Sequence, residues 1–351
     1  MKNITRLALA CLLFFACTLS AEQIKKVKIG AVLGLTGVLA EFSQNLKEGI
    51  LLASEDLRQA GVIDLEIIFE DNEWQVAKSV AAYKRLTEVE KVKTVYVNSS
   101  GATLSIKPIS EKQKVLLFSL AAHSEIIKNS KYVLRHGGRS DLDAAVVANK
   151  LIELAPQKVA VLSLENEWSE HFEKDLIQYL KSKNSKINLL LESHSPTESD
   201  FKAILIRLLK SKPDALLINS IGLATANIVI QARQLGFRGK IIANNGLVLS
   251  FDALKLLQDR KEDIVYQTYE LAPVEFERRL PNKSKIAAAY IYYAYQDVEL
   301  LGKLIAKFGE DPETIVNNIK QQKIFYGKYG TIEFSDEGES NIITLMHNSI
   351  Y

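Results

Sequence analysis

The residues best suited to bind a ligand are a run of small polar residues, Asn98-Ser99-Ser100-Gly101-Ala102-Thr103, between an apolar run and an amphipathic stretch. This pattern predicts that a strand ends here and that a helix begins. The first backbone N–H groups of a helix have no partner within the helix, and its dipole makes this end positive. The run therefore predicts an anion or carboxylate site. Ser99 or Ser100 could equally be a plain helix cap, because caps use the same residue types.

Two other predicted loops carry side chains that could line a pocket. Trp168 follows Glu165-Asn166-Glu167 at a loop-to-helix junction, where an aromatic ring could form one wall, although core packing explains it as well. His123 follows Ala121 and Ala122 in a comparable loop, and a surface histidine is the simpler interpretation. Helical spacing of four further aromatic residues favours core packing over a site; they are Tyr290, Tyr292, Tyr293 and Tyr295.

Motifs of common enzymes are missing from the sequence. It has no G-x-S-x-G, no H-E-x-x-H and no P-loop, and its five histidines are scattered without metal-ligand spacing. The glycines of residues 30–37 do not follow the dinucleotide spacing G-x-G-x-x-G. Solvated loop charges explain two acidic pairs, which are Asp71 with Glu73 and Glu165 with Glu167. We therefore expect no catalytic residue, no cofactor and no metal site.

The first 21 residues have the pattern of a secretory signal peptide. A basic tip with Lys2 and Arg6 precedes an apolar core at residues 7–15 and small residues ending near Ala21. The core is shorter than the ~20 residues that span a membrane, so we predict cleavage and a soluble mature protein. Lipidation at Cys17 is a less favoured alternative, because an aromatic residue stands where that signal usually has Leu, Val or Ile.

Removal of this segment would change the composition in two ways. Both cysteines, Cys11 and Cys17, lie within it, so the mature chain could form no disulfide and no cysteine-ligated site. The segment holds two of the 44 basic residues and no acidic residue, which leaves 42 basic against 42 acidic residues. This balance gives no indication of nucleic-acid binding, and we expect none. With 351 residues, 47% of them hydrophobic, the chain can build two domains.

From residue 27 onward, short apolar runs alternate with amphipathic stretches, the pattern of strand–helix units around a mostly parallel sheet. The first set has predicted strands at 27–33, 65–69, 94–97, 115–118 and 132–134, with helices at 43–59, 74–90 and 102–112. A polar, glycine-bearing stretch at 135–141 suits a crossing. The second set has helices at 142–154, 168–182, 200–210 and 223–235, with strands at 158–164, 187–192, 215–219 and 240–243. We therefore expect two doubly wound α/β lobes with parallel sheets.

The last hundred residues contain a long amphipathic helix at 283–308 and strand-like segments at 329–335 and 341–351. They are too few for a third domain, so we expect them to pack on the two lobes and the chain to cross between them more than once. In open parallel sheets, ligands bind beyond the carboxyl ends of the strands. The loops there are 34–42, 71–73, 98–103, 119–124, 165–169, 220–224 and 244–248, rich in Gly, Ser, Asn and Asp.

Several segments, in collinear order, resemble the leucine/isoleucine/valine-binding type of periplasmic receptor that serves ABC importers. They include KIGAVLGLTGVLAEFSQNLKEGI, FEDNEWQVAKSVAAYKRL, VYVNSSGATLSIKPISEKQ, YVLRHGGRSD, KVAVLSLENEWSEHFEKDL and GKYGTIEFSDEG. The resemblance implies the type I periplasmic binding protein fold, with two lobes that are joined by a three-crossing hinge and close on a ligand. The predicted division is residues 22–138 with 268–330 for lobe 1, and 139–267 with 331–351 for lobe 2.

The resemblance also implies roles for particular residues. Ser99, Ser100 and the loop Ala121-Ala122-His123 would hold a ligand carboxylate, and Trp168 would be the aromatic residue of the cleft. Contacts from the second lobe would come from Ile221, Gly222, Asn245 and Gly246. Relatives that bind amino acids commonly place an acid in the last of these loops to hold the ammonium group, whereas this chain has Asn244-Asn245-Gly246-Leu247-Val248. His123 also stands where a small hydroxyl residue is usual. The resemblance thus implies the carboxylate half of the site alone.

From these observations we expect a periplasmic, non-enzymatic solute-binding protein that acts as a monomer. Its ligand would be an amino acid or a related small carboxylate, and its partner would be a membrane ABC permease. Two alternatives remain: a ligand-binding sensor component of a signalling system, and a secreted hydrolase that uses one of the acidic loops.

Overall fold

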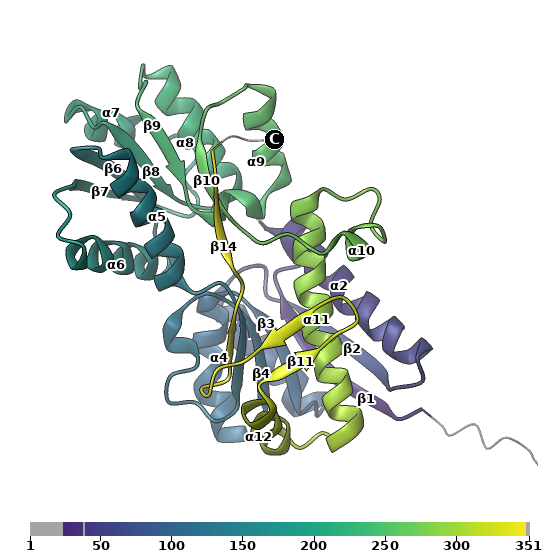
Figure 1. Cartoon of the computed structure of the whole chain (residues 1–351). Coiled ribbons are helices and arrows are strands. Elements are labelled where there is room, and N and C mark those ends of the chain that lie inside the picture. Colours follow the sequence, from purple (N-terminus) through teal and green to yellow (C-terminus); the bar gives the residue numbers. More distant parts are fainter. Residues whose placement is uncertain (1–23, 38, 349–351) are drawn as a thin grey trace, which may run out of the picture.

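The computed structural model describes residues 24–37 and 39–348, so the predicted signal peptide, with Cys11 and Cys17, lies outside the described residues. The described chain forms two α/β lobes, each built around one six-stranded sheet (Figure 1). The strand order is β13-β5-β4-β3-β1-β2 in lobe 1 and β14-β10-β9-β8-β6-β7 in lobe 2. Within these two sheets, neighbouring strands are parallel except for β10 and β14. The predicted pair of doubly wound lobes is therefore confirmed.

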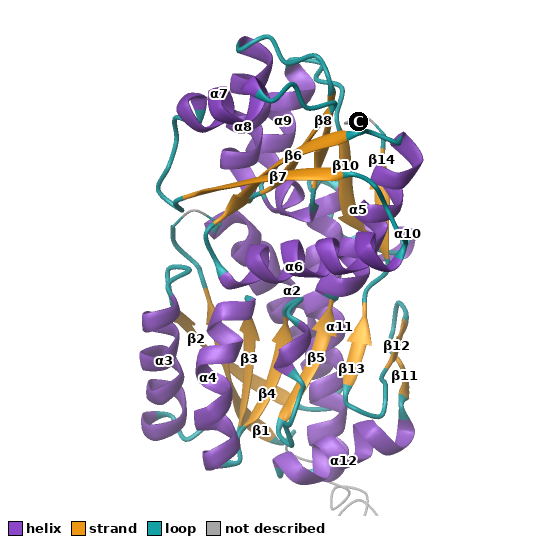
Figure 2. Cartoon of the chain, turned by 90° about the vertical axis from the view of Figure 1, so that its left-hand side faces the viewer, coloured by secondary structure: helices purple, strands orange, loops and turns teal. Residues whose placement is uncertain are grey.

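Lobe 1 begins with the predicted units, and helices cover both faces of its sheet (Figure 2). Its strands β3, β4 and β5 are buried at every residue, as expected for parallel strands enclosed by helices. The predicted helix at 74–90 starts two residues later, because Glu73 and Trp74 have positive φ angles of 51° and 59° that a helix cannot contain. The elements are β1 Lys26–Leu33, α2 Ala40–Gln59, β2 Asp64–Asp71, α3 Val76–Lys84 with a π turn at Arg85–Val89, β3 Thr94–Asn98, α4 Ser100–Gln113, β4 Leu116–Leu120 and β5 Val133–Gly137.

Lobe 2 repeats this arrangement, and its β6, β7, β8, β9 and β10 take the places that β1 to β5 have in lobe 1. The predicted strands and helices of this half agree with the structure to within a few residues. The chain then adds a 3-10 turn, a helix and a strand that were not predicted. These elements are short, and their sequences mix polar and apolar residues without a clear period. The elements are α5 Ser140–Leu154, β6 Lys158–Leu164, α6 Glu167–Ser182, β7 Asn188–His194, α7 Lys202–Lys210, β8 Ala215–Asn219, α8 Gly222–Gln234, β9 Lys240–Ala243, the turn Asn245–Leu249, α9 Phe251–Asp259 and β10 Val265–Tyr269.

The chain then returns to lobe 1, where the long helix α11 packs along α2 (Figure 1). Gly49 of α2 permits this close approach, because a Cβ at that position would lie 2.0 Å from the backbone oxygen of Ile291. The remaining elements are α10 Val274–Glu277, α11 Lys285–Phe308, α12 Pro312–Gln322, β11 Ile324–Tyr326, β12 Thr331–Glu333, β13 Glu339–Asn341 and β14 Thr344–His347. Within the described residues, no helix combines the length and the apolar character needed to cross a membrane.

The three crossings between the lobes follow β5, β10 and β13. The predicted division assigned residues 331–351 to lobe 2, which is wrong for the part up to Asn341. The strand β12 pairs with β11, and β13 pairs with β5 of lobe 1. The physical reason is Arg135, which is fully buried in β5 and whose guanidinium donates to the Glu339 carboxylate at 2.6 Å. The first crossing is shorter than the predicted segment 135–141. It has only residues 138–139 outside regular elements, because β5 runs to Gly137 and α5 begins at Ser140.

Candidate ligand-binding cleft

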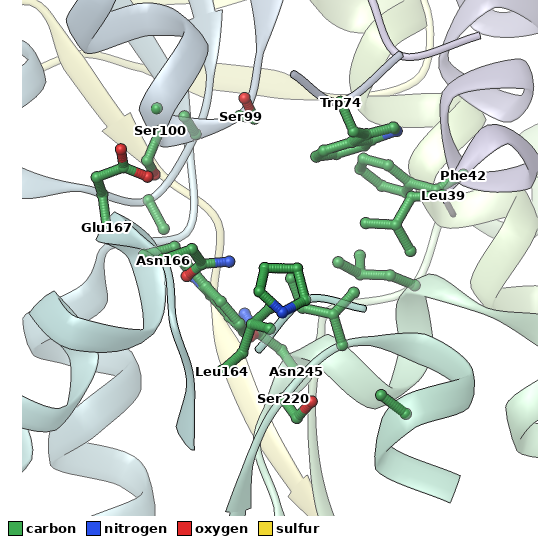
Figure 3. A pocket seen from close by; sticks show the side chains of 18 of the residues that line it. Leu39, Phe42, Trp74, Ser99, Ser100, Leu164, Asn166, Glu167, Ser220 and Asn245 are labelled. Carbon is green, nitrogen blue, oxygen red and sulfur yellow. The ribbon is translucent and has the colours of Figure 1, made fainter. Parts of the chain in front are cut away.

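A cavity of about 750 Å³ lies between the lobes and is lined by residues of both. Its walls come from the carboxyl ends of the parallel strands, where the topology predicted a site; the residues include Ser99, Leu120, Gly137, Leu164 and Ser220. Figure 3 shows the open space at its centre with side chains from both lobes around it. The volume falls within the ~300–1,000 Å³ typical of small-molecule sites.

The start of α4 supplies free donors to this cavity. Ser99 has a φ of 78°, uncommon for a residue other than glycine, and its hydroxyl accepts the N–H of Ala102 at 3.3 Å. Ser99 thus caps the helix, which is one of the two alternatives that the sequence left open. The hydroxyl of Ser100 also lines the cavity, yet it makes no hydrogen bond to any described residue. The unpaired groups of this helix start and Ser100 therefore remain available to a ligand.

The loop after β4 has residues in two places: some line the cavity, and one contacts lobe 2. Ala121 and Ala122 line the cavity, and Arg135 fixes them by donating to the backbone oxygen of Ala121 at 3.2 Å. His123 does not line it. Its ring stacks on His171 of α6 in lobe 2, with ring centres 3.7 Å apart and planes inclined by 17°. Burial lowers the pKa of His123 to about 4, and the nearby His171 contributes to this shift.

In lobe 2, Trp168, Ile221 and Asn245 line the cavity, whereas Gly222 and Gly246 lie behind this surface. A Cβ on Gly246 would lie 2.1 Å from the backbone oxygen of Ser220 and 3.0 Å from the ring of Trp168. Glycine at this position therefore leaves the space that the Trp168 ring occupies.

The polar groups of lobe 2 near the cleft are mostly bonded to one another. The Asn219 amide donates to the Ser163 hydroxyl at 3.1 Å and to the Ser169 backbone oxygen at 2.8 Å. The Asn244 amide donates to the Asn219 side-chain oxygen at 2.6 Å. His194 Nε2 lies 2.8 Å from the Ser220 hydroxyl. This network holds the loops in place and leaves few of their donors for a ligand.

An aromatic wall in lobe 1 escaped the sequence interpretation. Phe42 contacts Trp74 with ring centres 5.9 Å apart, and Tyr290 meets Phe42 edge-on at 4.8 Å. Tyr290 and Tyr293 both line the cavity, three residues apart on one face of α11. The packing interpretation is correct for Tyr292 and Tyr295, whose hydroxyls bond to Tyr329 and Asp56, and incomplete for the other two. The spacing of Tyr290 and Tyr293 was the signal that could have revealed them.

The turn that presents Trp74 is held by Asp71, one of the acidic residues singled out in the sequence. Its carboxylate accepts the Thr36 hydroxyl at 2.6 Å and the N–H groups of Leu35 and Glu73 at 2.9 and 2.8 Å. Burial alone would raise the pKa of Asp71, but these hydrogen bonds lower it overall. The Trp74 indole N–H donates to the backbone oxygen of Gly34 at 3.1 Å. Asp71 is thus a structural residue of the cleft.

The charged side chains that line the cavity are all acidic: Glu73, Glu167 and Glu198. Glu73 is paired with Lys78 at 2.5 Å, whereas the carboxylate of Glu167 makes no ion pair or hydrogen bond within residues 24–37 and 39–348. Its carboxylate lies beside Ser100 (Figure 3), and a Cβ on Gly101 would be 3.0 Å from its Oε2. An acceptor for a ligand cation therefore stands next to the anion donors. Across the described ranges, no cluster of three or more His, Cys, Asp or Glu could hold a metal ion.

The family model for periplasmic binding protein matches residues 26–345. A Leu-, Ile-, Val-, Thr- and Ala-binding protein of Pseudomonas aeruginosa is 23% identical over 95% of this chain and 91% of its own. Among solved structures, a leucine-binding protein of Thermotoga maritima shares the fold with a TM-score of 0.80, 24% identity and coverage of 91% of this chain and 94% of its own. A solute-binding protein of R. palustris in complex with 4-hydroxybenzoate also has a TM-score of 0.80, at 18% identity, covering 92% of this chain and 93% of its own.

These matches confirm the type I fold and the expectation of a binding protein, and the hydrolase alternative is thereby removed. The match spans both lobes and all three crossings. The chain therefore belongs to the periplasmic binding protein family.

Proposed function

We propose that the protein captures a small carboxylate-bearing ligand, an amino acid or a related acid, between its lobes and delivers it to a membrane ABC permease. The observation that carries this proposal is the start of α4, where Ser100 and unpaired N–H groups line the cavity between the lobes. The names of the relatives from P. aeruginosa and R. palustris, one an amino-acid-binding protein and one a complex with an aromatic acid, support it. Residues 1–21 would direct export to the periplasm.

The roles proposed for the predicted residues follow from their places around the cavity. The ligand carboxylate would be held at Ser99 and Ser100 with the N–H groups of the Ala121-Ala122 loop. Closure would bring Trp168, Ile221 and Asn245 over the ligand, and the exclusion of water would strengthen the hydrogen bonds. His123, Gly222 and Gly246 would act indirectly. His123 would act through its contact with His171 between the lobes, and the two glycines through the packing of the lobe 2 loops.

Glu167 supplies a carboxylate for a ligand ammonium group, which the loop 244–248 does not supply. Because its carboxylate lies beside Ser100, an amino acid bound through its carboxylate could place its ammonium group against it. A carboxylic acid without an ammonium group would instead be disfavoured by this charge. Comparison of phenylalanine with 3-phenylpropionate, in the wild type and in Glu167→Gln, separates the two ligand classes.

The proposal is tested by a thermal-shift screen of the protein purified after export and refolded to remove any carried ligand. The panel holds leucine, phenylalanine, 3-phenylpropionate, phenylethylamine and glucose. A compound at 100 times its dissociation constant should stabilise the fold by about 2.7 kcal/mol. We expect a shift with at least one acid that is lost in Ser100→Ala and kept in Ser105→Ala, a serine of the same helix outside the cavity lining. A shift with glucose or phenylethylamine and with none of the acids would contradict the proposal.

A further inference from the structure

A pair of stacked histidines joins the two lobes beside the cavity. His123 comes directly after Ala122, which lines the cavity from lobe 1, and His171 comes one helical turn after Glu167, which lines it from lobe 2. The two ring centres are 3.7 Å apart and the ring planes are inclined by 17°. The hydroxyl of Ser124 also lies 2.8 Å from His171 Nε2. Neither ring lines the cavity, so this contact depends on the closure of the lobes and not on contact with the ligand.

The two sides of the contact are held by different lobes. His171 Nε2 lies 3.5 Å from the carboxylate of Asp175 on the same helix. Asp175 in turn accepts the hydroxyl of Ser140 at 2.9 Å, and Ser140 begins α5 directly after the first crossing. His123 and Ser124 belong to the loop after β4 of lobe 1. A rotation at the crossings that opens the cleft therefore separates the rings and removes the contact between Ser124 and His171.

The contact is compatible with a neutral His123 ring. His123 Nδ1 accepts the backbone N–H of Glu125 at 3.1 Å, so the proton of the neutral ring is on Nε2. A second proton on Nδ1 would remove this acceptor and place a cation at stacking distance from His171. Burial lowers the pKa of His123 to about 4, and His171 acts in the same direction. In an open form the ring regains water and leaves His171, so its pKa returns toward the ordinary value of about 6.5.

The charged groups around the pair do not remove this penalty. Glu125 raises the pKa of His123 and Lys174 lowers it, so the two oppose each other. Glu125 is also exposed and paired with Lys128 at 3.1 Å. The charged residues that face the pair from neighbouring elements are Lys107 on α4, Arg139 and Asp141 at the start of α5, and, within one turn of His171 on α6, Glu167, Glu170, Glu173, Lys174 and Asp175.

We propose that His123 and His171 form an acid-sensitive latch: the neutral pair stabilises the closed form, and protonation of the pair opens the lobes and releases the ligand. This inference goes beyond the proposed function and needs only that the lobes close on a ligand. Apparent affinity falls with the fraction of closed protein, and closing excludes a proton between pH 6.5 and 4. Because the rings are partly exposed, we expect an affinity about fivefold weaker at pH 5 than at pH 7.

The test measures leucine affinity and dissociation rate at pH 7, 6 and 5, by titration calorimetry and stopped-flow fluorescence. Leucine keeps one carboxylate and one ammonium group over this range. If the thermal-shift screen finds phenylalanine or glucose instead, that compound replaces leucine, so a failure of the proposed carboxylate ligand leaves this test in force. The wild type should release its ligand faster at pH 5, with a smaller change in the association rate, because ligand enters the open form.

Two variants separate the latch from other titrating groups. His123→Phe keeps a stacking ring without a titratable proton, and its affinity should change by less than about twofold between pH 7 and 5. His347→Gln removes a histidine of β14 that stacks on Tyr266 within lobe 2, and it should keep the pH dependence of the wild type. Asp143, whose pKa burial raises to about 6, is present in all three proteins and contributes equally to each.

Two outcomes would overturn the latch. If His123→Phe binds leucine with the same pH dependence as the wild type, His123 has only a packing role, and binding at pH 7 leaves the proposed function intact. If acid changes the association rate alone, the titrating group acts on docking of the ligand and not on opening of the lobes. A reduced pH dependence in His123→Phe, located in the dissociation rate and absent from His347→Gln, supports the latch.

Discussion

Two equivalent strands, β3 of lobe 1 and β8 of lobe 2, each end at an asparagine that a serine follows, and the two asparagines differ in their hydrogen bonds. In lobe 2, the Asn219 amide bonds to Ser163 and Ser169 and accepts from Asn244, while Ser220 bonds to His194. In lobe 1, the amide nitrogen of Asn98 is buried without a partner in the described chain. The next residue but one, Ser100, likewise keeps a free hydroxyl.

From this difference we expect the two lobes to have different roles in ligand binding. In lobe 2, the polar groups of the loops are hydrogen-bonded to one another and hold the loops in place. These loops present Trp168, Ile221 and Leu223 to the cleft. In lobe 1, Ser100 and the first N–H groups of α4 are unpaired at the cavity, so we expect a polar ligand to gain most there when water is excluded. We therefore expect the ligand to dock first on lobe 1 and lobe 2 to close over it by rotation at the three crossings.

The largest effect should come from the asparagines at the ends of these strands. Asn219→Ala removes a side chain with three hydrogen bonds and leaves their partners buried, so it should lower the free energy of unfolding by about 2–4 kcal/mol. Asn98→Ala, its counterpart in lobe 1, removes an amide nitrogen that has no partner and should cost about 1 kcal/mol or less. Urea unfolding of both variants measures the difference. Similar losses in the two would break the comparison.

Removal of the Trp168 ring, which lines the cleft from lobe 2, should weaken ligand binding without a comparable loss of folding stability. Trp168→Ala takes away apolar surface that closure would bury against the ligand, a contribution of about 1.5–3 kcal/mol, or roughly 10- to 150-fold in affinity. Tyr179→Ala serves as the control, since this ring is on the same helix and bonds to Asn149 far from the cavity lining. Calorimetric titration with an acid that stabilises the wild type gives both values. Unchanged affinity in Trp168→Ala would show that lobe 2 does not cover the ligand with this ring.

The smallest effect concerns the contact between the lobes and its response to pH. The pKa of His123 is about 4 in the folded protein and near 6.5 in an unfolded chain. Between these values the unfolded chain binds the proton first, so the free energy of unfolding should fall as the pH drops from 6.5 to 4 and change no further below it. The titratable groups around the ring are His171, Glu125 and Lys174. Because the ring is partly exposed, we expect an effect of about 1 kcal/mol.

His123→Phe provides the measurement for this effect. Phenylalanine keeps a ring that can stack on His171 but carries no titratable proton. The melting temperature of the variant should therefore depend less on pH between 6.5 and 4 than that of the wild type. Identical profiles would assign the pH dependence to other groups, such as Asp143, whose pKa burial raises to about 6 and whose effect on stability has the opposite sign.

The fold could be predicted from the sequence wherever a strand or helix had a strong period. The buried strands and most helices follow directly from apolar runs and amphipathic spacing. The last strand of lobe 1 could not be predicted this way, because residues 339–341 (ESN) are polar and are placed by the buried pair of Arg135 and Glu339. Short segments whose placement depends on one distant partner carry no periodic signal.

The site could be predicted in part for the same kind of reason. Ser99, Ser100 and Trp168 lie at loop positions that the topology alone brings to the cleft. Trp74, Phe42 and Tyr290 come from a strained turn and two helices, and their common wall depends on how α11 packs against α2. His123 was assigned to the ligand through the resemblance, but its ring pairs with His171 across the lobes. Neither of these contacts leaves a local pattern in the sequence.

The central claim, that polar recognition belongs to lobe 1, is tested most directly by two matched serine substitutions. The dissociation constant of the acid that gives the largest thermal shift would be measured by calorimetry for wild type, Ser100→Ala and Ser220→Ala. The account predicts at least a 10-fold weaker complex for Ser100→Ala and a change of less than about threefold for Ser220→Ala, since the Ser220 hydroxyl is already bonded to His194. A greater loss in Ser220→Ala than in Ser100→Ala would contradict it.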